Sequence, residues 1–231
     1  MRHLESVMPH LWLCPSPRAN LNATILNPVP FERLDILMPI DASIPERYRA
    51  LYAEGAQGFH CWAIGGDHRA RGFFSTCMNP GSVCLFSEPS SGVFHLAARV
   101  LGRVDPCECA KPNSTRCARR VDGRPDGPCV RRASTIQLAR ELWPADVEKP
   151  SPWELLFFTT PATSVSIPKQ QLVESVGWSS NYGVPFTRPI KDVNKPRRLR
   201  HTELLGRIGD LDTLWNDILR NNPIDYLYAN G

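Results

Sequence analysis

The 231-residue sequence predicts an α+β fold in which helices pack outside a small mixed or antiparallel β-barrel. Three observations support this class. Apolar segments of strand length alternate with glycine- and proline-rich turns between residues 58 and 104. The most strand-like run of the chain, Trp153–Thr159, follows a short helical segment. Near the C-terminus, apolar residues recur with the 3.6-residue period of a helix, which predicts helices at 201–221.

The first 42 residues are rich in proline and are expected to be extended or irregular. We interpret residues 1–42 as an N-terminal extension that packs on a domain spanning residues 43–231. The first helix of that domain is expected to begin near Ser43. Ser43 and Glu46 have the spacing of a capping box, and Pro45 suits the first turn of a helix.

The remaining elements follow from local patterns. Strands are predicted at 58–64, 83–86 and 93–104, and the short loop at 88–92 makes an antiparallel hairpin of the last two. Residues 68–76 suit a short helix or a loop. Residues 105–132 have no apolar periodicity and carry four prolines and four cysteines, so we interpret them as an insertion. A helix at 134–142, strands at 153–159 and 165–167, and a helix at 169–176 complete the domain.

Composition excludes several classes of protein. The chain is 42% hydrophobic, which is too apolar for intrinsic disorder, and it has no run of about 18 apolar residues to span a membrane. The apolar core of the N-terminus is too short for a secretion signal. A soluble, cytoplasmic protein is therefore expected.

The net charge of +4 is ordinary, but the basic residues are clustered. Residues 99–140 hold ten Lys and Arg against four Asp and Glu, and residues 187–200 hold six against one. The rest of the chain is acidic on balance. Two basic segments on an acidic body suit a polyanionic partner such as nucleic acid, although two solvated loops would give the same pattern.

Four of the eight cysteines lie in the polar insertion, with the spacing C-x-C-x7-C-x11-C: Cys107, Cys109, Cys117 and Cys129. Four thiolates complete the tetrahedral set of a structural zinc ion, and such a site would order a loop that has no core of its own. The alternative is a reduced loop that binds no metal. Cys61, Cys77 and Cys84 lie in apolar runs and are expected to be buried.

No enzyme motif is present in the sequence. It contains no GxSxG, P-loop, GxGxxG or HExxH pattern, and its six histidines are scattered. We therefore predict no catalytic residue. A small hydrolase or metal enzyme that uses the cysteines and histidines is the alternative from the enzyme class.

The order of the aromatic and turn motifs resembles the EVE and YTH branch of the PUA-like superfamily. The resemblance covers roughly residues 58–209 without the insertion. The segments that carry it are Phe59–Ala63, Met78–Phe86, Val93–Val100, Leu142–Pro144 with Trp153–Thr160, and Val165–Pro168. The segment from Gly177 to Arg188 is similar to EVE-like modules of modification-dependent, type IV, restriction enzymes. The insertion and residues 1–42 are departures from the family pattern.

The resemblance implies a reader of modified nucleic acid that takes one base out of the stack and holds it in an aromatic pocket. Trp62 would form one wall of the pocket with the backbone of Ala63 nearby, and Trp143 would form the other wall. Further pocket candidates are Asp67, Ser75 and Asn181 for the base edge, and Trp178 and Tyr182 for the rim. Phosphate would be contacted by Arg188, Lys191, Lys195, Arg197 and Arg198.

The function implied is binding of DNA that carries a modified base, with methylated or hydroxymethylated cytosine as the expected target. In this reading the chain is the sensing module of a restriction system, with an HNH-type nuclease fused to it or acting as its partner. An RNA-binding PUA-like domain is the alternative.

Overall fold

The computed structural model describes residues 9–65, 68–89, 91–106, 129–144, 153–170, 172 and 188–189. The chain divides into two compact units. Unit 1 holds residues 1–18, 77–100 and 161–231, and unit 2 holds residues 19–76 and 101–160. Unit 1 is built mainly of strands and unit 2 combines strands with helices, so the predicted α+β class is confirmed.

Unit 1 is built on paired strands in the order β6–β4–β3–β1–β7. Their bounds are β1 Leu11–Pro15, β3 Val83–Ser87, β4 Val93–Arg103, β6 Thr163–Pro168 and β7 Arg188–Pro189. The predicted β3–β4 hairpin is confirmed, because Val83 pairs with Arg99 and Phe86 with Leu96 in antiparallel register. The chain turns just before β3 at Gly81, which has φ +88°, a conformation that glycine adopts without strain.

Strand β1 was not placed in the sheet by the sequence analysis. It pairs in parallel with β3, and Leu11 through Cys14 are all buried. A strand buried on both faces shows no alternation of apolar and polar residues, so its pattern resembles any short apolar run. The indole N–H of Trp12 donates to the carbonyl oxygen of Cys77 at 3.1 Å, which satisfies the one polar atom of this buried side chain.

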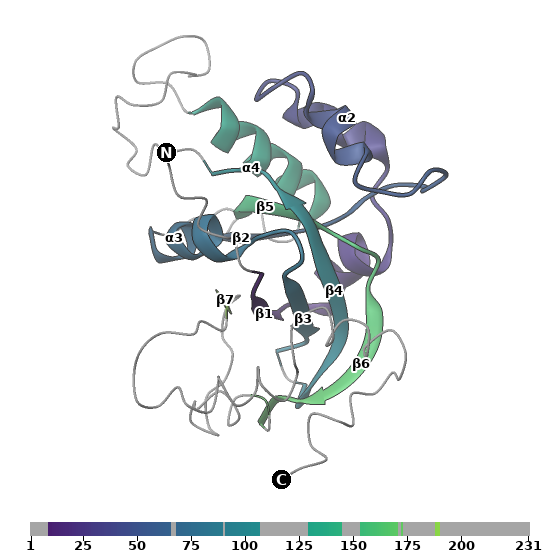
Figure 1. Cartoon of the computed structure of the whole chain (residues 1–231), viewed down its shortest axis with the longest axis vertical. Coiled ribbons are helices and arrows are strands. Elements are labelled where there is room, and N and C mark those ends of the chain that lie inside the picture. Colours follow the sequence, from purple (N-terminus) through teal and green to yellow (C-terminus); the bar gives the residue numbers. More distant parts are fainter. Residues whose placement is uncertain are drawn as a thin grey trace, which may run out of the picture. The chain divides into compact units, whose positions relative to one another are not determined.

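Unit 2 combines short helices with two paired strands. Its elements are α1 Arg18–Leu21, the π-helix η1 Asn22–Leu26, the 3-10 helix η2 Phe31–Leu37, α2 Ile44–Arg49, β2 His60–Gly65, α3 His68–Cys77, α4 Val130–Leu142 and β5 Trp153–Thr159. Residues 101–103 of β4 also belong to this unit, and β4 neighbours β5. Helix α4 packs on β5 (Figure 1), and it also packs on η2. Among the described residues, β2 and β7 each pair with one strand, so the closed barrel stays a prediction.

Three local expectations need correction. The N-terminal 42 residues are not irregular throughout, because 18–26 and 31–37 are helical and bury Leu21, Ile25 and Leu34. Helix α2 does begin after Ser43, but the Ser43 hydroxyl donates to Asp41 instead of capping the helix. Helix α4 begins at Val130, four residues before the position expected, so the end of the supposed insertion is helical.

Glycine is required where β2 begins. A Cβ on Gly58 would lie 2.2 Å from the carbonyl oxygen of Val29. Val29 and Phe59 form a two-bond bridge at this point, at 2.7 and 2.8 Å. The bridge joins the chain after η1 to the start of β2. Within the ranges that the structure describes, no helix has both the length and the apolar character needed to cross a membrane.

Strands β2 and β5 pair antiparallel from His60–Thr159 to Ile64–Leu155, after which Gly65 pairs with Trp153. Glu154 is therefore the extra residue of a β-bulge. A bulge bends the strand and redirects the side chains around it. Trp153 and Glu154, which lie at this bulge, belong to the two clusters described below.

Acid is expected to destabilise the fold through His60, which is 7% exposed at the start of β2. Burial lowers the pKa of His60, while its contacts with the backbone of Ile25 and Thr24 oppose the change. Between the ordinary histidine pKa near 6.5 and the lowered folded value, the unfolded chain binds a proton that the native chain does not bind. Stability therefore falls with falling pH, by up to about 1.4 kcal/mol per pH unit. Urea unfolding of wild type and His60→Asn at pH 7 and pH 5 measures how much free energy of unfolding each protein loses between the two pH values. The wild type should lose more, and equal losses in the two proteins would contradict the prediction.

Candidate nucleic-acid interface

Three tryptophan side chains of unit 2 meet in one cluster, which we call the indole cluster: Trp62, Trp143 and Trp153. The ring centroids of Trp62 and Trp143 lie 5.4 Å apart with the planes at 67°. Trp153 lies 6.2 Å from Trp62 and 6.5 Å from Trp143. Trp62 is 1% exposed and Trp143 3%, whereas Trp153 is half-buried. The structure thus brings together the two tryptophans that the sequence analysis named, and adds a third.

Each indole is positioned by a different element. Trp62 lies in the middle of β2, opposite Phe157 of β5. Trp153 begins β5 beside the bulge, and Trp143 follows directly after α4, where its backbone N–H bonds the Ala139 oxygen and ends the helix. Pro144 cannot continue the helix, so the chain turns at this point. The cluster forms where a strand centre, a strand start and a helix end meet.

The rings of Trp62 and Trp143 do not leave room for a base between them in this structure. A base between two parallel rings needs them about 6.8 Å apart, twice the 3.4 Å stacking distance of DNA. Here the two indoles touch edge to face. The indole N–H of Trp143 is buried and has no hydrogen-bond partner among the described residues. A buried donor without a partner is unusual and is available to a ligand that opens the cluster.

A second cluster lies at Glu154, the residue next to Trp153. The Glu154 side chain is 3% exposed and forms ion pairs with Arg71 of α3 and Arg132 of α4. A buried carboxylate is expected to be paired, because an unpaired one would lose its hydration without replacement. These residues line a small hollow that opens to solvent. Arg131 lines the same hollow and donates to the backbone oxygen of Asp105 at 2.8 Å.

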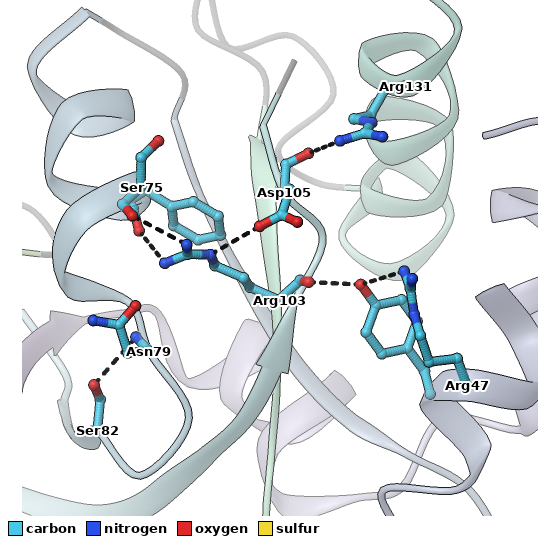
Figure 2. Close-up of polar contacts among 9 residues, drawn as sticks. Arg47, Ser75, Asn79, Ser82, Arg103, Asp105 and Arg131 are labelled. Atoms are coloured by element: carbon cyan, nitrogen blue, oxygen red, sulfur yellow. Dashed lines mark hydrogen bonds and ion pairs between the residues drawn. The ribbon is translucent and has the colours of Figure 1, made fainter. Parts of the chain in front are cut away.

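Arg103 ties α3 to the end of β4 (Figure 2). Its guanidinium donates to the carbonyl oxygens of Phe74 and Ser75 at 2.8 and 3.0 Å, and to the Asp105 carboxylate at 3.2 Å. The Arg103 carbonyl oxygen accepts a 2.6 Å bond from the Tyr48 hydroxyl. Burial raises the pKa of Tyr48, so its hydroxyl stays a donor at neutral pH. The network holds the C-terminal end of α3 and the rim of the hollow in one arrangement.

The other residues predicted for the base pocket are placed as follows. Ala63 is buried in β2 and pairs with Leu156. Ser75 is exposed on α3, and its bond with Arg103 uses its backbone oxygen and not its hydroxyl (Figure 2). Asp67, Trp178, Asn181 and Tyr182 lie outside the described residues.

The predicted phosphate and metal residues are less fully described. The backbone of Arg188 is in β7, where it pairs with Leu13, and Lys191, Lys195, Arg197 and Arg198 lie outside the described residues. Cys107, Cys109 and Cys117 also lie outside them, whereas Cys129 is buried directly before α4. The described residues contain no group of three or more metal-ligating side chains. Zinc at the four cysteines therefore stays a prediction. Cys61, Cys77 and Cys84 are buried, as expected.

Sequence reasoning missed Trp153, Arg71, Arg132 and Glu154 as members of a site. From the sequence, Trp153 is predicted only as the first residue of a strand, Arg132 is counted only as part of the basic segment 99–140, and Arg71 only within the net charge. One signal was present: a glutamate inside the most apolar run of the chain requires a cationic partner if it is buried. Which arginines supply that partner depends on the packing of α3 and α4 against β5.

No family model and no curated protein matches this sequence. The structure is similar to a solved structure described as the N-terminal domain of Thermococcus gammatolerans McrB bound to m5C DNA. The TM-score is 0.51 with 12% sequence identity, over 90% of this chain and 98% of that one. The chain therefore has the fold of that domain, which is consistent with the α+β class predicted from the sequence.

Proposed function

We propose that this protein binds DNA carrying a methylated or hydroxymethylated cytosine and takes the modified base into the indole cluster. The observation that carries the proposal is the convergence of Trp62, Trp143 and Trp153 in one cluster. The shared fold supports it, because the similar McrB domain was solved bound to m5C DNA. In this proposal the chain is the sensing module of a modification-dependent restriction system, with a nuclease as fused domain or partner.

The energies are of the right size for such a reader. Unstacking and unpairing one base costs a few kcal/mol, and stacking on an aromatic ring returns about 1–3 kcal/mol per base. A methyl group buried against the indoles adds about 0.8 kcal/mol. This free energy corresponds to an affinity about fourfold higher for methylcytosine than for cytosine, from the methyl group alone. Hydrogen bonds to the base edge, for which Asp67, Ser75 and Asn181 are the candidates, add discrimination between bases.

Binding requires the cluster to open. The edge-to-face contact of Trp62 and Trp143 contributes about 0.5–1.5 kcal/mol, which a stacked base replaces. Trp143 is the ring that moves in this proposal, because it follows the end of α4 whereas Trp62 lies in the middle of a paired strand. Its unpartnered indole N–H then meets a polar atom of the base or sugar. The basic segment from Arg188 to Arg198 supplies phosphate contacts.

Matched duplexes that differ in one cytosine test this function. We expect the duplex with 5-methylcytosine to bind at least about fourfold more tightly than the unmodified duplex. A 2-aminopurine placed beside the modified base should become more fluorescent on binding, because its stacking partner leaves the helix. Equal affinity for the two duplexes, or tighter binding of a single-stranded or folded RNA, would contradict the proposal.

A further inference from the structure

The hollow beside Glu154 is lined by three guanidinium groups that the proposed function does not yet use. Arg71 comes from α3, and Arg131 and Arg132 come from the first turn of α4. All three are half-buried, so their charges are less screened than those of arginines on an open surface.

Among the described residues, Arg131 is the guanidinium of this hollow that has no carboxylate partner. The single carboxylate of Glu154 is shared by Arg71 and Arg132, and the carboxylate of Asp105 pairs with Arg103. Arg131 bonds only the neutral carbonyl oxygen of Asp105 among the described residues (Figure 2). Glu154 and Asp105 thus pair with Arg71, Arg132 and Arg103, and neither described carboxylate forms an ion pair with Arg131.

The guanidinium groups are also held in place. Glu154, fixed at the bulge of β5, holds Arg71 and Arg132 from two different helices. The first turn of α4 contains no acidic residue and has no side-chain cap, so its backbone N–H groups add positive potential beside Arg131 and Arg132. A preorganised guanidinium loses little rotational freedom when it binds an oxyanion, and its planar fork can bind two oxygens at once.

The hollow and the indole cluster share their elements. Trp153 and Glu154 are consecutive in β5, whereas Arg131 and Trp143 lie at opposite ends of α4, about 18 Å apart along the helix axis. We propose that this hollow receives a backbone phosphate of the bound DNA, within a few nucleotides of the one whose base enters the indole cluster. The proposal rests on the proposed function and adds a second phosphate contact to the Arg188–Arg198 segment.

Arg131→Gln is the variant that tests the proposal. Arg131 makes no ion pair among the described residues, so its replacement disturbs the fold least. Losing one phosphate contact should weaken binding of modified and unmodified duplexes alike, by roughly fivefold at 0.15 M salt. The slope of log K against log salt should become shallower by about 0.9. The ratio of the affinity for the modified duplex to the affinity for the unmodified duplex should not change. Arg131→Lys keeps the charge and should keep the slope.

Arg140→Gln is the matched control, because Arg140 is exposed in the last turn of the same helix and does not line the hollow. An unchanged salt slope in Arg131→Gln, or an equal change in Arg140→Gln, overturns the phosphate site. Binding of inorganic phosphate that depends on Arg131, with no change in the DNA slope, also overturns it, since the hollow would then hold only a small free anion. Failure of the proposed function gives a different result: a shallower slope in Arg131→Gln together with equal affinity for the two duplexes.

Discussion

Trp143→Leu is expected to lose the preference for the modified duplex and to bind both duplexes with the affinity of the wild type for plain DNA. Leucine keeps apolar volume beside Trp62 but offers no ring on which a base can stack. Stacking on one ring is worth about 1–3 kcal/mol, so affinity for the modified duplex should fall by roughly 5- to 150-fold. Fluorescence anisotropy titrations with the two duplexes measure the change.

The control for a general effect of losing a tryptophan is Trp12→Leu. Trp12 is as buried as Trp143, lies in unit 1, and loses its hydrogen bond to Cys77 when replaced. It should reduce stability without changing the ratio of the two affinities. If Trp143→Leu retained the preference for the modified duplex, or if Trp12→Leu abolished it, the indole cluster would not be the base-binding site. Thermal melts of both variants show that the comparison is made on folded protein.

Glu154→Gln is expected to produce the largest loss of stability of any single charge removal in the described chain. Glutamine has nearly the same shape but carries no charge, so Arg71 and Arg132 lose the carboxylate that they share. Removing one partner of a buried ion pair costs about 3–5 kcal/mol. The lower end of this range is expected because the Arg132 side chain is 40% exposed and can turn toward water. Urea denaturation followed by tryptophan fluorescence measures the free energy of unfolding.

The exposed ion pair of Arg33 and Glu141 supplies the comparison. Its atoms lie 2.6 Å apart, but the two side chains are 55% and 34% exposed. Glu141→Gln should reduce the free energy of unfolding by less than about 1 kcal/mol, because water replaces most of what the pair contributes. Similar losses in Glu141→Gln and Glu154→Gln would mean that burial of Glu154 does not make its pairing essential.

Most of the strands could be predicted because their signals are local. The run Trp153–Thr159 and the hairpin of β3 and β4 contain apolar, β-branched and aromatic residues between turn-forming ones, and the structure has strands there. The helices of residues 18–37 could not be predicted in this way. They are four to seven residues long, too short to form without tertiary contacts, and their apolar residues are buried by the rest of unit 2.

In the candidate site, too, some features could be predicted from the sequence and others depend on tertiary packing. The resemblance to the EVE and YTH branch implied that Trp62 and Trp143 converge, and their rings do meet. The inclusion of Trp153 depends on the bulge at Glu154, which changes the register of β5 by one residue. A one-residue register change is invisible in the periodicity of so short a strand.

The sequence by itself determined the α+β class, the positions of the main strands, and an order of aromatic and turn residues that resembles one family of folds. These features depend on residues close together in the chain, whose propensities and spacing act before any long-range contact forms. The tertiary structure alone decided the parallel pairing of β1, the edge-to-face closure of the indoles, and the pairing of Glu154 with two arginines. Those contacts join segments 60 to 90 positions apart in most cases, and their geometry is set by how helices and strands pack, which no local pattern of residues specifies.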